Sequence, residues 1–299
     1  MTMTRETSVA RARASLVGLA VGDAFGETMA SPGAAKRIAK RLLPIARPWR
    51  WTDDTAMALS IVEILERRGA IDPDELARAF AARWRAEPDR GYGLGASTLL
   101  QRVDEGANWR VEAQRLFRGQ GSFGNGAAMR AAPIGAYFAP DLDRIAFEAR
   151  RSAEPTHTHP EGWAGAIAVA VAAGLATQQV TGSALLDAVI KATPETATRR
   201  GLRRARELGL RFEVQLAGEQ LGTGCDVSAH DTVPFCIWVA ARHLDSYETA
   251  IWTATSEGGD TDTNGAIVGS IVACATGVAG IPVLWRAATE RLPPPFDAP

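Results

Sequence analysis

Residues 162–186 read GWAGAIAVAVAAGLATQQVTGSALL and contain no charged side chain. A second uncharged stretch runs from Thr263 to Trp285, and each stretch is long enough to cross a bilayer. Both consist mainly of Ala, Gly, Val, Thr and Ser instead of Leu and Phe, and the second directly follows a group of acidic residues. The pattern therefore favours helices buried in a large helical core over membrane spans.

The composition of the whole chain also predicts an all-α protein. The 299 residues include 55 Ala but only 3 Tyr and 9 Phe, which favours Ala-rich helices over a sheet of aromatic and β-branched strands. Lys and Arg number 33 against 34 Asp and Glu, a balance that argues against a nucleic acid or an anionic membrane as the main partner. The Arg-rich run 199–211 is more typical of a solvated helix face than of a nucleic-acid patch.

The chain is expected to form one domain over residues 1–299, because it shows neither a repeat nor a Ser- or Pro-rich linker. Residues 1–8 and 293–299 are expected to be tails. Asp23 interrupts the N-terminal apolar run, which argues against an export signal. The three cysteines lack CxxC spacing, so the sequence predicts neither a disulfide framework nor a zinc site, and a reducing cytoplasm fits best. Nothing in the sequence indicates an oligomeric state.

Apolar residues spaced three or four apart predict several helices, among them residues 9–20, 57–65 and 76–84. Gly-rich joints are expected to separate the helices. These joints are residues 22–26, 91–95, 119–126 and 258–259. They hold nearly all the polar residues that could take part in binding or catalysis, so the functional site is expected where loops meet helix ends.

Two groups of acids and hydroxyls stand at such places. In WTDDTAMALS (51–60), the group Thr52 to Thr55 precedes a helix and, taken alone, is typical of a helix N-terminus. In GGDTDTNGAIVG (258–269), the residues Asp260, Asp262 and Thr263 again precede an uncharged helix. Four carboxylates would crowd one small volume if the two helices pack with their starts together, and such crowding is repulsive without cations.

All these candidate ligands are hard oxygen atoms, which favours Mg²⁺ or Mn²⁺ over zinc or copper. Their number suits two ions, although a structural Ca²⁺ is an alternative.

The joint GQGSFGNGAAMRAAPIG (119–135) contains GxGxxG, but the preceding residues 110–118 predict a charged helix instead of the buried strand that a dinucleotide fold requires. Its small residues suit backbone N–H groups of Ser122 to Gly126 approaching a diphosphate, or simply a tight connection between helices. The HxH pair in THTHP (156–160) has no third nitrogen or sulfur nearby, so contact of His157 with a ligand is favoured over metal binding.

Taken together, these stretches resemble the ADP-ribosylglycohydrolase family, which includes the dinitrogenase reductase-activating glycohydrolase and the hydrolases of ADP-ribosylarginine and ADP-ribosylserine. Six motifs match in family order: GLAVGDAFGE (18–27), WTDDTAMALS (51–60), RGYGLGAST (90–98), GSFGNGAAMRAAPIG (121–135), THTHPEG (156–162) and EGGDTDTNGAIVG (257–269). The resemblance implies an all-α, compact, orthogonally packed bundle with a centre of two metal ions, and an ADP-ribosylated protein or small ADP-ribosyl compound as substrate.

The resemblance also implies roles for individual residues. The residues matching the family's metal ligands are Thr52, Asp53, Asp54, Asp260, Asp262 and Thr263. The residues matching its substrate-binding positions are Gly91, Tyr92, Gly93, Ser122, Phe123, Gly124, Asn125, Met129 and His157.

One motif departs from the family pattern. The family often reads GDALGxxxE, whereas Ala30 stands at the position of the acid here and Glu27 directly follows Gly26. Either Glu27 takes over the role of that acid from a neighbouring position, or the role is absent. The candidates for the general base are Asp53, Asp262 and Glu27, and the sequence does not rank them.

The resemblance implies metal-dependent hydrolysis of the bond that joins ADP-ribose to a modified side chain, with arginine favoured as acceptor and serine next. The reaction would pass through an oxocarbenium-like state, with the metals holding ribose hydroxyls and activating a water. Two other functions stay open. One is a module that binds ADP-ribose or a nucleotide without cleaving it, and the other is a two-metal phosphoester hydrolase.

Overall fold

The computed structural model describes residues 4–31 and 33–297, and in that part of the chain the regular elements are helices, with no strand. The fold is all-α, as the composition predicts. The α-helices are α1 (Arg5–Met29), α2 (Ala34–Lys40), α3 (Asp53–Arg68), α4 (Pro73–Ala86), α5 (Leu94–Asp104), α6 (Trp109–Gly119), α7 (Ala132–Phe138), α8 (Leu142–Ala153), α9 (Pro160–Thr177), α10 (Gly182–Ala192), α11 (Ala197–Leu208), α12 (Val214–Leu221), α13 (Ala229–Arg242), α14 (Tyr247–Thr255), α15 (Thr261–Thr276) and α16 (Val283–Ala288). Two 3₁₀ turns, η1 (Asn125–Ala127) and η2 (Val278–Gly280), complete the set.

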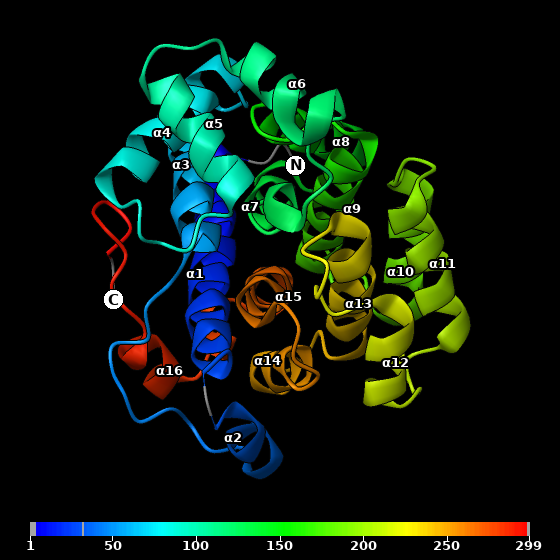
Figure 1. Cartoon of the computed structure of the whole chain (residues 1–299). Coiled ribbons are helices and arrows are strands. Elements are labelled where there is room, and N and C mark those ends of the chain that lie inside the picture. The colour runs from blue at the N-terminus through cyan, green and yellow to red at the C-terminus, as the bar shows by residue number, and fades with distance from the viewer. Residues whose placement is uncertain (1–3, 32, 298–299) are drawn as a thin grey trace.

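Helices α1 and α15 pack backbone to backbone at the centre of the molecule (Figure 1). A Cβ atom built on Gly22 would lie 2.1 Å from the carbonyl oxygen of Gly265, and one built on Gly26 would lie 2.1 Å from that of Thr261. Gly18, a turn before Gly22, meets Gly269 in the same way. Because residue numbers rise along α1 as they fall along α15, the two helices run antiparallel, and the start of α15 lies beside the second half of α1.

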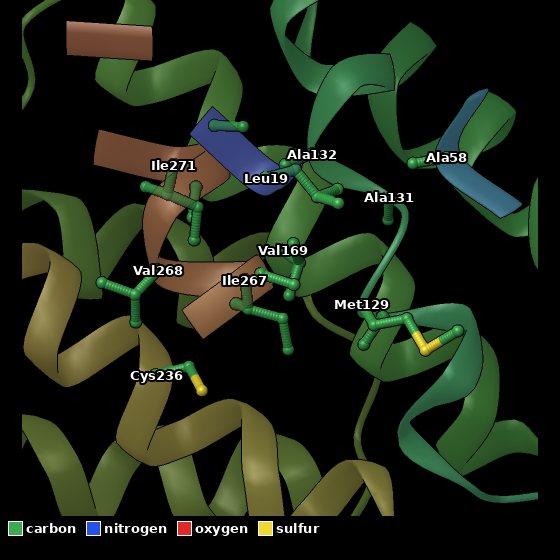
Figure 2. Close-up of a cluster of buried hydrophobic side chains, with 14 of the residues drawn as sticks. Leu19, Ala58, Met129, Ala131, Ala132, Val169, Cys236, Ile267, Val268 and Ile271 are labelled. Carbon is green, nitrogen blue, oxygen red and sulfur yellow. The ribbon is translucent and has the colours of Figure 1, made fainter. Parts of the chain in front are cut away.

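The other helices surround this central pair, with α3 to α6 on one side and α10 to α13 on the other (Figure 1). Leu19 of α1, Val169 of α9 and Ile267 of α15 meet in one buried apolar cluster (Figure 2). This cluster fixes how the helices that carry the site stand to one another.

Each of the two uncharged stretches contains one long buried helix, and each helix ends where the backbone breaks its geometry. Helix α9 ends at Thr177, and Gln179 has a positive φ of 61°. Helix α15 ends at Thr276, and Gly277 has a φ of 68°. Among the described residues, no helix combines the length and apolar character that crossing a bilayer requires.

Three expectations from the sequence are wrong. The Gly-rich residues 22–26 are not a joint between helices, because they lie inside α1 and give the close approach to α15. Residues 5–8 are not a tail, because α1 begins at Arg5, whose guanidinium bonds the carbonyl oxygens of Glu66 and Arg67. Residues 1–3 and 298–299 of the expected tails lie outside the described residues. Near the other end, Phe296 is buried beneath the Arg13 guanidinium, so residues 293–297 are not a free tail.

Candidate active site

The first acidic group stands at the N-terminus of α3 and is held there by a buried carboxylate of α1. The Thr52 side chain caps the helix by accepting from the Asp54 N–H. Asp23 accepts from the backbone N–H of Thr52 at 3.0 Å, from that of Thr55 at 3.1 Å and from the Thr55 hydroxyl at 2.5 Å. Because all these donors belong to one turn, Asp23 fixes the turn against α1.

The second acidic group stands at the N-terminus of α15, beside the same part of α1. The Thr261 hydroxyl donates to the Gly26 carbonyl at 2.8 Å, which ties this end of α15 to α1. Asp260 is the N-cap residue and accepts from the Asn125 amide at 2.6 Å. The packing of α1 on α15 therefore joins two acidic groups that lie about two hundred residues apart in the sequence.

Asp262 is the carboxylate that the other acids share as a neighbour. Burial, and after it the Asp262 charge, raise the pKa of Asp53 to about 7 and that of Asp260 to about 7. The pKa of Asp54 is also raised, first by burial and then by the surrounding carboxylates. Burial and Asp262 raise the pKa of Glu27 too, while Arg50 lowers it. These carboxylates repel one another in the absence of positive charge.

The donor set fits divalent cations. Asp54 Oδ1 is buried without a hydrogen-bond partner, an arrangement that is costly unless something positive lies against it. The neighbouring donors are carboxylates and the hydroxyls of Thr52 and Thr263, which are ligands that Mg²⁺ and Mn²⁺ accept. Within the described chain, no three Asp, Glu, His or Cys side chains already form a metal-binding group, so ion binding would require some of them to turn.

The loop from Gly121 to Gly126 lies next to the acidic groups, because Asn125 bonds Asp260. The N–H of Gly124 already donates to the Ser122 hydroxyl and that of Asn125 to the Val227 carbonyl. Of the N–H groups expected to meet a diphosphate, these two are therefore already engaged. His157 is buried against the loop, since Cβ atoms built on Gly124 and Gly126 would lie 3.5 and 3.4 Å from its Nε2.

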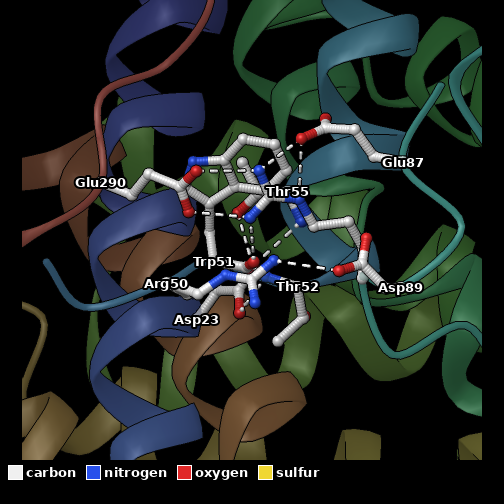
Figure 3. A network of polar contacts seen from close by, with 9 residues as sticks. Asp23, Arg50, Trp51, Thr52, Thr55, Glu87, Asp89 and Glu290 are labelled. Carbon is white, nitrogen blue, oxygen red and sulfur yellow. Dashed lines mark hydrogen bonds and ion pairs between the residues drawn. The ribbon is translucent and has the colours of Figure 1, made fainter.

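Arg90 ties two site loops to the C-terminal segment. Three residues that it contacts, Trp51, Glu87 and Glu290, lie close together in Figure 3. Its guanidinium lies 3.4 Å from the Trp51 ring centroid and donates to Glu290 at 2.7 and 2.8 Å and to Glu87 at 2.6 Å. Its carbonyl accepts from the Asp53 N–H at 2.7 Å. Arg90 thereby positions both the start of α3 and the adjoining Gly91 to Gly93 loop.

Comparison with known proteins shows the family of the chain. The sequence profile of the ADP-ribosylglycohydrolase family matches residues 4–297. The chain belongs to this family. ADP-ribosylhydrolase ARH3 of Mus musculus is 30% identical over 273 residues, which cover 80% of this chain and 73% of the relative. ARH3 of Homo sapiens is 31% identical over 273 residues, which cover 80% of this chain and 74% of the relative.

A solved structure described as an ADP-ribosylglycohydrolase-related protein complex superposes on this family member with a TM-score of 0.70. The two chains are 26% identical, and the superposition covers 95% of this chain and 94% of the chain in the solved structure. The all-α fold of the family is therefore shown by sequence and by structure.

The acidic residues expected at the site stand together. Glu27 is exposed at the edge of this group, close enough to Asp262 for its pKa to respond, whereas Ala30 lies beyond the end of α1 as its C-cap. Gly91 adjoins Asp53, since a Cβ built on it would lie 3.7 Å from Asp53 Oδ1.

The remaining expected residues differ in their exposure. Tyr92 and Met129 are buried, and Phe123 is half-buried against Phe117 and His159. Their binding roles stay predictions.

Three further residues hold the site and were not assigned a site role from the sequence. They are Asp23, Arg90 and Arg130, whose guanidinium donates to the Gly126 carbonyl and to the Thr156 hydroxyl. Asp23 interrupts a long apolar helix, and that interruption is a usable signal of a buried structural acid. Arg90 and Arg130 lie inside the quoted motifs, but their partners are known only once the chain is folded.

A groove of about 850 Å³ lies elsewhere, between α1 and the segment that follows η2. It includes none of the acidic site residues, so it is separate from the candidate active site.

Proposed function

We propose that this family member hydrolyses the bond between the anomeric carbon of an ADP-ribosyl group and a protein side chain, releasing ADP-ribose. Arginine is the favoured acceptor and serine the next. The bond from the anomeric carbon to the acceptor nitrogen or oxygen breaks, a water oxygen takes its place, and a proton passes to the acceptor. The observation that carries the proposal is the meeting of the two acidic groups around Asp262, in a chain of this family.

Two divalent cations are proposed to bind between the starts of α3 and α15. The proposed ligands are Thr52, Asp53 and Asp54 at the start of α3, and Asp260, Asp262 and Thr263 at the start of α15. Bound Mg²⁺ or Mn²⁺ would supply positive charge that orders ribose hydroxyls and makes a water more acidic. The buried Asp54 oxygen without a partner supports this assignment. The diphosphate is expected along the loop Ser122 to Asn125, within reach of His157.

The general base is one of Asp53, Asp262 and Glu27. Asp53 has a pKa of about 7 before any cation binds, and Glu27 is the exposed member. The nearness of Glu27 to Asp262 supports the view that it replaces the acid absent at Ala30, and it favours an enzyme over a module that only binds ADP-ribose.

The test is mass spectrometry of the products from ADP-ribosyl-arginine and ADP-ribosyl-serine peptides, with Mg²⁺ or Mn²⁺ and with EDTA. Intact ADP-ribose released from either peptide, and lost in EDTA, is the expected result. Release of AMP would indicate a phosphoester hydrolase instead. Binding of ADP-ribose without release from either peptide would favour the binding module.

A pair of variants ties the result to the site. Asp262→Asn is expected to lower the release rate at least about 100-fold, because it removes the carboxylate that the other acids share. Glu219→Gln removes one exposed charge on α12 and is expected to leave the rate unchanged. Equal rates for both variants would contradict the assignment.

A further inference from the structure

Arg130 is a fully buried cation beneath the Ser122 to Gly126 loop. Its Nη1 donates to the Gly126 carbonyl at 2.8 Å, and its Nη2 donates to the Thr156 hydroxyl at 2.8 Å and to the Ser152 carbonyl at 3.2 Å. A guanidinium only donates hydrogen bonds, so Thr156 Oγ1 is the acceptor in this contact.

The Thr156 hydroxyl in turn lies 2.7 Å from His157 Nδ1. Because Arg130 donates to the oxygen of this hydroxyl, the hydroxyl hydrogen has two possible acceptors. One is Nδ1, and the other is the Ala153 carbonyl oxygen, which at 3.4 Å is at the limit of a hydrogen bond. The short contact to Nδ1 is the better bond, and the charged donor on the hydroxyl oxygen strengthens it.

Electrostatics favour the same arrangement. A proton on Nδ1 would point the positive end of the N–H dipole toward the Arg130 cation, whereas a bare Nδ1 points its lone pair that way. A doubly protonated ring is disfavoured as well, because burial and the Arg130 charge lower the pKa of His157 to about 3. The ring is therefore neutral at physiological pH, and its proton sits on Nε2.

Nε2 faces the loop, beside Gly124 and Gly126. Among the described residues, none accepts a hydrogen bond from Nε2, so this donor is available to a ligand oxygen. We infer that Arg130 and Thr156 are positioning residues that lock His157 as the Nε2–H tautomer, so that the ring presents one fixed donor to an oxygen of bound ADP-ribose. The ligand in this inference rests on the proposed function, but the tautomer does not.

The tautomer is measured directly by nitrogen NMR of the protein labelled with ¹⁵N-histidine. The chain has four histidines, and loss of one spin system in His157→Gln assigns the signal. The expected result is a protonated Nε2 and an unprotonated Nδ1 that accepts a hydrogen bond. A protonated Nδ1 in the unsubstituted protein would overturn the inference.

Thr156→Val removes the hydroxyl while conserving volume and leaves Arg130 its bonds to Ser152 and Gly126. In this variant, the Nδ1 resonance is expected to move to the position of an imine nitrogen without a hydrogen bond. Thr156→Ser restores the hydroxyl and is expected to restore the original resonance. An Nδ1 resonance that is the same in all three proteins would also overturn the inference. Thermal unfolding checks whether each variant is folded.

Titration calorimetry with ADP-ribose then tests the consequence for the site. Thr156→Val is expected to weaken binding about tenfold, which corresponds to about 1.4 kcal/mol, and Thr156→Ser less than about twofold. Equal affinity in all three proteins would contradict the role of the fixed donor. If the unsubstituted protein does not bind ADP-ribose at all, the proposed function fails, and the NMR result still decides whether Arg130 and Thr156 set the tautomer.

Discussion

Asp262 acts on the site through charge. Asp53, Asp54, Asp260 and Glu27 all have raised pKa values, and Asp262 contributes to each shift. A carboxyl group whose pKa is higher in the folded than in the unfolded state binds more protons when folded. The free energy of unfolding therefore falls as pH rises through the interval between the two pKa values.

For the protein in EDTA, we expect the midpoint temperature of thermal unfolding to decrease as the pH rises from about 4 to about 7, because the pKa of Asp53 and of Asp260 is about 7 in the folded chain and about 4 in the unfolded chain. Millimolar Mg²⁺ should reduce the fall by offsetting the repulsion. Asp262→Asn should flatten the pH dependence, since it removes the shared charge. Differential scanning calorimetry in matched buffers measures the midpoints, and a variant with an unchanged slope would contradict the role of Asp262.

At the scale of elements, the contact between α1 and α15 sets the geometry of the site. Glycine at 22 and 265 lets the two backbones touch, and Asp23 and Asp262 lie one residue from Gly22 and three from Gly265. Any separation of these helices moves the two acidic groups apart. Packing and chemistry therefore depend on the same few residues.

Gly22→Ala would place a Cβ 2.1 Å from the Gly265 carbonyl oxygen, so the helices would have to separate. We expect a loss of about 3 kcal/mol in the free energy of unfolding, measured by urea denaturation. Gly95→Ala in α5 is the matched control. Its Cβ would meet the Phe117 ring at 3.8 Å, an ordinary contact, so we expect no loss. Similar losses in both variants would show that the close approach is unimportant.

At the scale of the whole molecule, the C-terminal segment reaches back to the site. Glu290 pairs with Arg90 across two hundred residues, and the backbone of Trp49 exchanges hydrogen bonds with Ala288 and Glu290. Arg90 then holds the Asp53 N–H through its carbonyl. The segment around Glu290 thus supports the loop that begins α3 (Figure 3).

Glu290→Gln should cost about 2 kcal/mol of unfolding free energy, because a charged hydrogen-bond acceptor for the buried Arg90 is lost. Asp89→Asn removes the partner of Arg50 in a pair at 3.5 Å that is largely exposed, and it should cost less than about 0.5 kcal/mol. Urea denaturation measures both values. An equal cost for the two substitutions would argue against the anchoring role of Glu290.

Local signals allowed correct prediction of the helical class and of the two acidic groups at helix starts, because helix N-termini and apolar periodicity depend on residues a few positions apart. The same local reasoning failed at residues 22–26. Considered without the rest of the fold, the glycines there indicate a break between helices. In the folded chain they lie inside α1 and allow the backbone of α15 to approach closely. Residues 5–8 and 293–297 were expected to be tails for the same reason, since their partners are remote in sequence.

Composition and local patterns were enough to predict the all-α class, the two acidic groups at helix starts and the family motifs. The folded chain was needed to show that Asp262 lies near Asp53 and Asp54 and that Asp23, Arg90 and Arg130 hold the site. It was also needed to show that Glu27 lies near the acids while Ala30 ends a helix. The reason is physical: helix formation depends on neighbours in the chain, whereas a buried charge depends on whichever groups the packed core brings within a few ångströms.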